Sequence, residues 1–303
     1  MGTLFLLAVA LLVVDLSTGF GLFLSKAIVL RIRTAGLACS AVLVLIAHVQ
    51  GLRPPAVEQY EIPVNGLPAD LDGITIAILS DLHLGEMLLN ADWLNARVRQ
   101  VQASQPDCIV LVGDLFEWSS DPVALSPVLR QLSAPLGVFA VRGNHERLRP
   151  RRPDHAGKIL TASGIRLLTN EWTELASGLV LVGIDDLTSI RRQGGGGQDH
   201  LTRALANRPA GATLLLSHTP WLVEQAAAHG VDLMLSGHTH NGQIWPFSYL
   251  VHTRYPFLGG QYRVVDMNLF VCRGTGTWGP RMRLWQRGEI ALVTLRCPAE
   301  LPQ

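Results

Sequence analysis

The chain has 303 residues, of which 48% are apolar and only 16% are charged, and its formal net charge is +1. The apolar content and the seven tryptophans exclude an intrinsically disordered chain. No part of the chain is strongly basic, so we do not expect a nucleic-acid-binding protein.

The first fifty residues have the composition of a membrane anchor, with only four charged residues: Asp15, Lys26, Arg31 and Arg33. The apolar segment 3–24 is about 20 residues long, which is enough to cross a bilayer as a helix. A second apolar run, 34–49, is just short of a comfortable span. We therefore predict a hairpin of two transmembrane helices over 1–52. A cleaved signal peptide is the alternative, but such a peptide begins with basic residues and has a single, shorter apolar core.

The basic residues of this region predict the orientation of the anchor. Lys26, Arg31 and Arg33 lie between the two apolar segments, and the positive-inside rule places such a loop in the cytoplasm. Both termini and the rest of the chain would then lie outside the cytoplasm. Asp15 lies inside the first segment, and we interpret it as a cap or a contact between the helices rather than as a transport site.

The remaining sequence alternates short apolar runs with helix-like stretches, which is typical of an α/β fold. We predict a linker and an edge strand over 53–68, and one domain over 69–297. Buried strands are predicted at 74–79, 109–112, 138–141, 179–183, 214–217 and 233–235. Helices are predicted at 90–103, 123–132, 154–163, 199–206 and 222–229. The last four predicted strands form an antiparallel meander, at 262–266, 269–273, 281–285 and 290–295.

Polar side chains follow five of the predicted strands, each after a small residue that lets the backbone turn sharply. In chain order these junctions are Asp81-Leu82-His83, Gly113-Asp114, Gly143-Asn144-His145-Glu146, His218 and Gly237-His238-Thr239-His240. Each one alone is common in proteins, and a lone histidine after a strand is usually structural. Because ligands bind at the carboxyl ends of the strands in open α/β sheets, five such junctions together indicate a functional site.

The donor atoms at these junctions indicate a metal site. Without His145 they comprise two carboxylates, one amide oxygen and four imidazoles, a set that suits Mn²⁺, Fe²⁺ or Zn²⁺. Seven ligands exceed what one ion needs, so we predict two divalent ions bridged by a carboxylate, for which Asp114 is the candidate. Such a pair would hold a hydroxide and clamp the oxygens of a displacement at phosphorus.

These five ordered blocks resemble the motifs of the calcineurin-like metallophosphoesterases, which are D-x-H, G-D, G-N-H-[DE], a lone H and G-H-x-H. The resemblance covers roughly residues 58–297 and implies a four-layer sandwich of two mixed sheets flanked by helices. It implies that His145 stabilises the phosphoryl charge and protonates the leaving oxygen. It also implies one ion held by Asp81, His83, Asp114 and His240 and a second held by Asp114, Asn144, His218 and His238.

The apolar N-terminus and the run 237–246 resemble the membrane-anchored bacterial branch of this family, although many relatives have glycine where this chain has Asn241. With the orientation predicted above, this branch implies a bacterial inner-membrane protein whose catalytic domain lies outside the cytoplasm. If residues 34–49 do not span the membrane, the domain instead faces the cytoplasm. The expected substrate is a phosphorylated small molecule or lipid at the membrane or cell envelope, cleaved at a diester, monoester or pyrophosphate. The alternative function is a metal-binding scaffold or sensor with little turnover.

Candidate substrate contacts are Arg142, the nearest cation for a phosphate oxygen, and Trp245, which follows the last predicted ligands. A structural salt bridge and core packing are the respective alternatives. A basic run over 147–152 is either a solvated loop or a contact to lipid headgroups or to a second phosphate.

Overall fold

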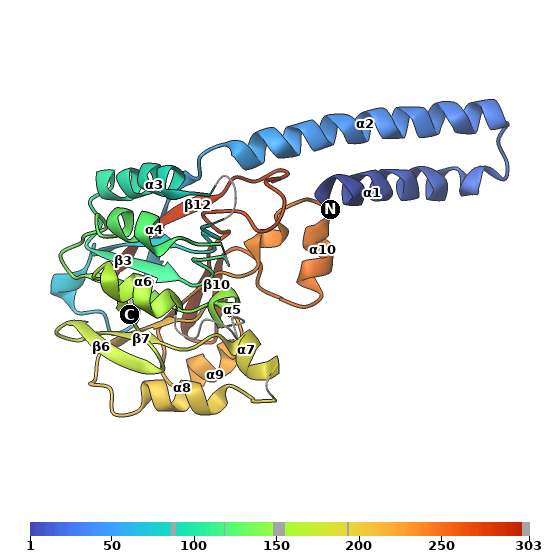
Figure 1. Ribbon diagram of the computed structural model, residues 1–303. Coiled ribbons are helices and arrows are strands. Elements are labelled where there is room, and N and C mark those ends of the chain that lie inside the picture. The colour runs from blue at the N-terminus through green and yellow to red at the C-terminus, as the bar shows by residue number, and fades with distance from the viewer. Residues whose placement is uncertain (86–88, 118, 148–154, 193, 299–303) are drawn as a thin grey trace.

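Two apolar helices form an antiparallel hairpin at the N-terminus of the computed structural model, which describes residues 1–303 apart from 86–88, 118, 148–154, 193 and 299–303. α1 (Gly2–Ser17) and α2 (Lys26–Leu52) are joined by a turn that contains the 3-10 helix η1 (Gly19–Gly21). The hairpin extends away from the rest of the molecule, and its open end, with the N-terminus, lies beside the domain (Figure 1).

The lengths of the two helices are the reverse of those predicted. Over the described part of the chain, α2, with 27 residues, is the one helix long and apolar enough to cross a membrane, whereas α1 has 16 residues. α1 ends early because Gly19 and Gly21 adopt left-handed backbone conformations, with φ of 57° and 77°. The prediction that segment 3–24 forms the longer span is therefore wrong.

The basic residues of the hairpin lie in α2 and not in the connecting loop, contrary to the prediction. Ser25 accepts a hydrogen bond from the backbone N–H of Ile28 at 3.4 Å, and this cap starts the helix at Lys26. The Arg33 guanidinium donates to the Asp15 carboxylate at 2.8 Å. This bond joins the two helices and confirms the interpretation of Asp15 as a contact between them.

The first of two mixed sheets has the strand order β1-β12-β2-β3-β4-β5. β1 pairs in parallel with β12 at the sheet edge, where segment 53–68 was predicted to place a strand. Apolar side chains on the outer face, among them Leu79 and Leu94, pack between the sheet and three helices. The strands are β1 (Ala56–Pro63), β12 (Glu289–Arg296), β2 (Thr75–Leu79), β3 (Cys108–Val112), β4 (Val138–Val141) and β5 (Arg166–Leu167). The helices are α3 (Ala91–Ala103), α4 (Pro122–Leu129) and α6 (His155–Ala162). The 3-10 helix η2 (Ala69–Leu71) precedes β2.

The second sheet has the strand order β10-β11-β9-β8-β7-β6. Its outer face is covered by three further helices, which bury Leu187, Leu201 and Val223 against it. The 3-10 helix η3 (His240–Gly242) and α10 (Phe247–His252) connect β9 to β10. The strands are β10 (Gly260–Val264), β11 (Met267–Val271), β9 (Leu233–Ser236), β8 (Ala212–Leu216), β7 (Leu179–Gly183) and β6 (Glu171–Ala176), and the helices are α7 (Leu187–Arg192), α8 (Gln198–Leu205) and α9 (Val223–Ala228).

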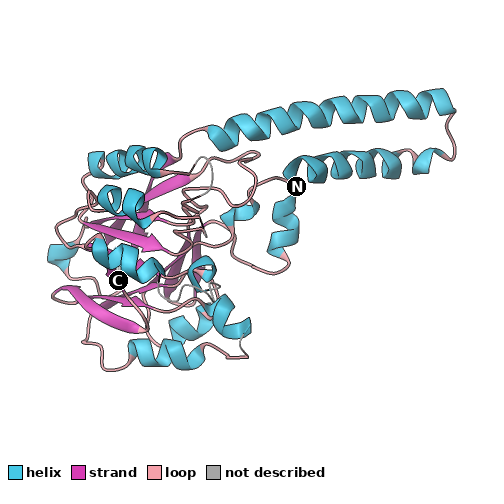
Figure 2. Ribbon diagram, in the orientation of Figure 1, coloured by secondary structure: helices cyan, strands magenta, loops and turns pink. Residues whose placement is uncertain are grey.

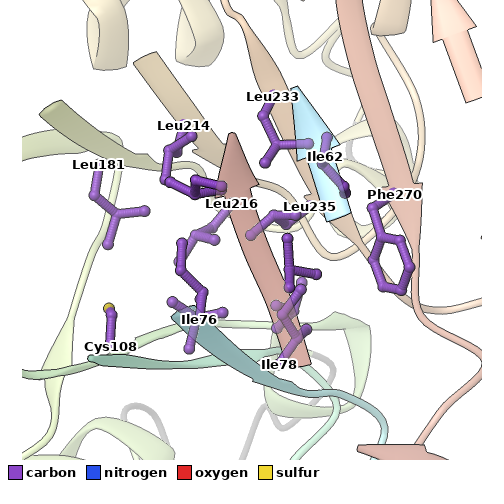
Figure 3. Close-up of a cluster of buried hydrophobic side chains, with 14 of the residues drawn as sticks. Ile62, Ile76, Ile78, Cys108, Leu181, Leu214, Leu216, Leu233, Leu235 and Phe270 are labelled. Atoms are coloured by element: carbon purple, nitrogen blue, oxygen red, sulfur yellow. The ribbon is translucent and has the colours of Figure 1, made fainter. Parts of the chain in front are cut away.

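The core of the domain lies between the two sheets. Ile76 and Ile78 from β2 belong to one buried cluster with Leu214 and Leu216 from β8 (Figure 3). Because side chains alternate along a strand, the intervening residues of β2 pack instead against the helices. Burial of each such side chain contributes about 1.5–3 kcal/mol. The order helices, sheet, sheet, helices (Figure 2) confirms the predicted four-layer sandwich.

The C-terminal strands do not form the predicted antiparallel meander. β10 and β11 form a hairpin, but β11 continues in parallel beside β9, and β12 crosses to the first sheet between β1 and β2. β12 takes this inner position because it is apolar on both faces, with Ile290 packed toward the helices and Ala291 toward the other sheet. The predicted strand 281–285 does not form, and Leu284 makes only an isolated bridge to Ile244.

Candidate metal centre

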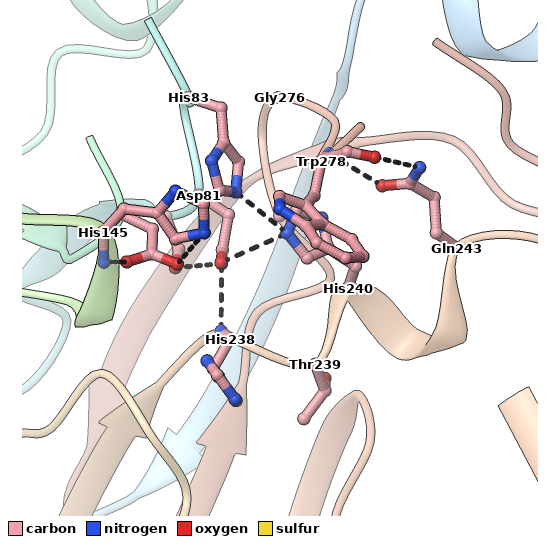
Figure 4. A network of polar contacts seen from close by, with 12 residues as sticks. Asp81, His83, His145, His238, Thr239, His240, Gln243, Gly276 and Trp278 are labelled. Carbon is pink, nitrogen blue, oxygen red and sulfur yellow. Dashed lines mark hydrogen bonds and ion pairs between the residues drawn. The ribbon is translucent and has the colours of Figure 1, made fainter. Parts of the chain in front are cut away.

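The polar residues predicted from the strand ends meet at one edge of the sandwich. Those of the first sheet follow β2, β3 and β4, where α5 (Asn144–Arg147) begins, and those of the second sheet follow β8 and β9. Several of them point toward one another in Figure 4. The residues gathered at this edge are Asp81, His83, Asp114, Asn144, His145, His218, His238 and His240.

A first donor cluster consists of Asp81, His83 and His240. The Nε2 atoms of the two histidines are 3.2 Å apart, and Nε2 of His240 is 3.4 Å from Oδ1 of Asp81. All three residues are buried. Three convergent donors at these separations can share one cation.

A second donor cluster consists of Asp114, His218 and His238. Nε2 of His218 lies 3.2 Å from Oδ2 of Asp114 and 3.2 Å from Nδ1 of His238. Burial alone would raise the pKa of Asp114, but the charges of His218 and of His83 from the first cluster hold it well below its ordinary value. Asp114 is therefore held as a carboxylate by histidines of both clusters.

Three of the four histidines in these clusters have their other ring nitrogen held by an outer partner. Nδ1 of His218 donates to the Val112 carbonyl at 2.8 Å, and Nδ1 of His83 donates to Glu117 at 2.6 Å. Nε2 of His238 is 2.7 Å from the Tyr255 hydroxyl. Metal-binding histidines are oriented in this way in proteins, because the outer bond fixes the ring and leaves the second nitrogen for the metal.

Two oxygen atoms of the site are buried without a hydrogen-bond partner among the described residues. They are Oδ1 of Asp81 and Oδ1 of Asn144. A buried acceptor without a donor costs about 1–3 kcal/mol, and a bound cation would remove that cost. The predicted pair of divalent ions therefore fits these residues.

The two histidines of the last motif are held neutral, which is the form that binds metals. Burial lowers the pKa of His238, and the charge of His218 lowers it further, to about 4. Burial and the neighbouring His83 hold the pKa of His240 well below its ordinary value. The opposite holds for His218, where burial is outweighed by Asp114 and the pKa is well above the ordinary value. A proton and a divalent cation would compete for its Nε2 atom.

The backbone of the site is strained at the residues that carry the donors. Five of the predicted ligands adopt left-handed conformations, with φ between 46° and 72°: Asp81, His83, Asp114, His238 and His240. This region costs residues with a Cβ atom roughly 1–2 kcal/mol each, and such strain concentrates at functional sites. Asn241 also has a φ of 51°. Asparagine tolerates this conformation better than most residues that carry a Cβ atom.

Glycine is required beside the donors because the chains approach closely. A Cβ atom on Gly143 would overlap the Asp114 carboxylate, and one on Gly113, whose φ is 77°, would lie 2.6 Å from Nδ1 of His218. Any larger residue would push the second donor cluster apart.

Glu117 is a residue of the site that the sequence analysis missed. Its carboxylate accepts hydrogen bonds from Nδ1 of His83 at 2.6 Å and from Nδ1 of His145 at 2.8 Å. Burial alone would raise the pKa of Glu117, but the bonds from His145 and His83 lower it to about 2. In return, the bond to Glu117 and the charge of Asp114 outweigh burial and raise the pKa of His145 to about 8. Nε2 of His145 remains 3.9 Å from Oδ2 of Asp114.

Glu146, the last residue of the third motif, holds the loop that carries Asp114. Its buried carboxylate accepts hydrogen bonds from the backbone N–H groups of Gly143, Asp114, Leu115 and Phe116 at 2.7–3.0 Å. Glu146 is therefore a structural residue that fixes the β3 and β4 junctions together.

The two predicted substrate contacts lie outside both donor clusters. The Arg142 guanidinium donates to Oγ1 of Thr169 at 3.0 Å and lies 3.5 Å from the Asp185 carboxylate. Trp245 lies in the loop before α10 and is 41% exposed. The basic run at 147–152 lies outside the residues whose side chains the structure describes.

Comparisons with known proteins agree with this geometry. A sequence model of the family described as calcineurin-like phosphoesterase matches residues 74–242. A Bos taurus protein named transmembrane protein with metallophosphoesterase domain is 33% identical over an alignment that covers 85% of this chain and 61% of that protein. An uncharacterized metallophosphoesterase of Aquifex aeolicus is 32% identical, with 79% of this chain and 91% of that protein covered.

Among solved structures, one described as a dimetal phosphatase from Danio rerio has a TM-score of 0.43 and 15% sequence identity, covering 70% of this chain and 91% of that chain. The chain spans about three fifths of the length of the vertebrate relatives it matches, whose names call them transmembrane proteins. The apolar helix α2 agrees with a membrane association. The family match over more than half of the sequence places this chain among the calcineurin-like metallophosphoesterases.

Proposed function

We propose that the protein is a dinuclear-metal hydrolase that cleaves a phosphoester bond. The observation that carries this proposal is the pair of donor clusters that share one edge of the sandwich, with Asp114 held as a carboxylate by histidines of both. Nitrogen and oxygen donors without thiolate favour Mn²⁺, Fe²⁺ or Zn²⁺. In our assignment Asp81, His83, Asp114 and His240 hold one ion, and Asp114, Asn144, His218 and His238 hold the other.

In the proposed reaction the two ions and His145 have separate roles. When bound, two divalent cations supply charge neutralisation at the phosphoryl oxygens and activation of water. His145 holds a proton at neutral pH because its pKa is raised to about 8. Glu117 fixes the ring through Nδ1, so Nε2 is the atom that donates a proton to the leaving oxygen. Arg142 and Trp245 are proposed to contact the substrate beyond the scissile bond.

The substrate class follows from the position of the hairpin. The loop after His240 runs through Ile244, which packs against Leu6 and Ala47 of the two apolar helices. A phosphoester carried by a lipid or by another membrane-bound molecule would therefore be close to the metal centre. We propose a membrane or cell-envelope substrate, cleaved at a diester, monoester or pyrophosphate, and we expect no nucleic-acid substrate.

The predicted location is the bacterial inner membrane, with the catalytic domain outside the cytoplasm. The three cations in the N-terminal part of α2, Lys26, Arg31 and Arg33, support this orientation. A cysteine introduced as Val123→Cys, at a position 83% exposed, should react with a membrane-impermeant thiol reagent in intact cells. A cysteine introduced as Phe23→Cys at the hairpin tip, 89% exposed, should react only after permeabilisation. The reverse labelling pattern would place the domain in the cytoplasm.

A panel of metals and substrates tests the activity. The full-length protein in detergent is loaded with Mn²⁺, Zn²⁺ or Fe²⁺ and assayed on an aryl monoester, an aryl diester and a lipid pyrophosphate. We expect metal-dependent hydrolysis of at least one of them, with two ions bound per chain. Binding of two ions with no turnover of any substrate would instead support the metal-binding scaffold.

A further inference from the structure

Exposed apolar side chains of the catalytic domain concentrate around the base of the hairpin. Beyond residue 52, nine large apolar side chains are exposed among the residues described. Six of these nine lie in two segments, 245–250 and 278–285. We call these six the aromatic collar: Trp245, Phe247, Tyr249, Leu250, Trp278 and Trp285.

The same two segments hold the hairpin. Ile244, Met282 and Leu284 form a buried cluster with side chains from both helices. The ring of Phe5 in α1 packs edge-on against Phe247, with ring centroids 5.5 Å apart. The collar is therefore continuous with the surface that carries the apolar helices.

Backbone hydrogen bonds also tie these segments to the end of α2. The N–H of Arg283 donates to the Ala47 carbonyl at 2.9 Å, and the N–H of Trp285 donates to the Gln50 side chain at 2.9 Å. These bonds fix the position of the collar along the axis of α2.

The length of α2 determines where the collar lies relative to a bilayer. The apolar run between Arg33 and Arg53 has 19 residues, roughly 29 Å of helix at 1.5 Å per residue, which matches a hydrocarbon core of about 30 Å. The domain covers one face of α2 from Leu43 onward, while Leu45, Val49 and Leu52 of the same stretch stay exposed. If the covering loops lay in water, only residues 34–42 would remain for the hydrocarbon, roughly half of the thickness required.

We propose that the aromatic collar lies in the interfacial layer of a phospholipid bilayer and forms part of the membrane-binding surface. Tryptophan and tyrosine favour this layer because their rings are apolar and their N–H and O–H groups are polar. Arg53 and Arg287 are exposed at the base of α2, close to Trp285, where they can meet lipid phosphates. The collar is then a second membrane contact of the domain, in addition to the hairpin.

The collar also borders the metal centre. The backbone of Trp278 exchanges two hydrogen bonds with the Gln243 side chain, and Gln243 directly follows η3, which begins at His240 (Figure 4). A collar in the interfacial layer would hold this edge of the sandwich at the level of the lipid headgroups. The membrane surface is inferred from exposure and helix length, so it stands independently of the proposed activity.

Fluorescence quenching by brominated lipids tests whether the aromatic collar lies in the interfacial layer. The full-length protein is reconstituted into phosphatidylcholine vesicles with bromine either near the headgroup end or near the tail of the acyl chains. We expect stronger quenching by the shallow bromines. A variant with Trp245→Phe, Trp278→Phe and Trp285→Phe should lose roughly half or more of that quenching, because interfacial tryptophans are the ones the shallow bromines reach.

The matched control carries Trp172→Phe and Trp221→Phe, which pack against the outer face of the second sheet; it should keep the quenching by shallow bromines. Co-flotation with vesicles is measured in parallel. If the protein floats while its collar tryptophans are quenched by aqueous acrylamide and not by lipid bromines, the collar lies in water and the proposal fails. Failure to float would overturn both the collar and the anchor.

Discussion

Replacing Asp114 by asparagine is expected to lower kcat/KM by roughly a thousandfold or more. The variant loses several kcal/mol of the transition-state stabilisation that the metals supply, and each 1.36 kcal/mol lowers the rate about tenfold. Asp114 is the carboxylate that we assign to both ions, and its Oδ2 atom lies 3.2 Å from Nε2 of His218. The amide keeps the shape but removes the negative charge. We expect the bound metal, measured by mass spectrometry of the purified protein, to fall below two ions per chain.

Asp266→Asn is the matched control, since this carboxylate is 91% exposed and its nearest cation is Arg263 at 3.8 Å. It should keep both metal content and rate. The thermal unfolding of the Asp114→Asn variant separates loss of metal from loss of fold. Two bound ions and an unchanged rate in a folded Asp114→Asn variant would contradict the role of Asp114 as a bridge.

Replacing His145 by alanine should slow the cleavage of esters in proportion to how poor their leaving group is. General acid catalysis contributes roughly a hundredfold to ten-thousandfold, and that contribution is needed for an alkoxide or phenoxide but much less for 4-nitrophenoxide. We therefore expect a large loss of kcat on phenyl esters and a small loss on 4-nitrophenyl esters. Metal content should remain at two ions per chain, because His145 lies outside both proposed ligand sets.

Glu117→Gln should show the same dependence on the leaving group in weaker form. The carboxylate holds the proton on His145 by raising its pKa to about 8, and the neutral amide cannot. His229→Ala removes an exposed imidazole whose one hydrogen-bond partner among the described residues is the Gln225 carbonyl, and it should leave both rates unchanged. Equal losses on both esters in the His145→Ala variant would show that His145 does not protonate the leaving oxygen.

The sequence predicted the inner strands of both sheets because those strands are short, apolar and followed by a turn. β2, β3, β4 and β7 lie within one or two residues of their expected positions. The path of β12 could not be predicted in this way, since its pairing with β1 and β2 joins residues more than 200 positions apart. The ends of α1 were misjudged because apolar composition continues through the turn at Gly19 and Gly21.

Each proposed metal donor could be found from sequence, because it stands two to four residues after the end of a strand. Glu117 and Tyr255 could not, because their roles depend on tertiary contacts with His83, His145 and His238. The available signal for Glu117 was a carboxylate three residues after Asp114 in the same loop. Tyr255 has no local signal, since it reaches His238 from the loop between α10 and β10.

The hairpin is a structural part of the catalytic domain and cannot be treated as a detachable tether. A chain cut before β1 would leave Ile244, Met282 and Leu284 bare in water and would remove the carbonyl that receives the N–H of Arg283. Without the bond to Ala47, the backbone of Arg283 would be held less firmly. This matters for the site because the Arg283 guanidinium donates to three carbonyls of the 273–276 loop beside His240. A water-soluble fragment would therefore be a poor substitute for the enzyme, and purification should retain the whole chain in detergent or a lipid disc.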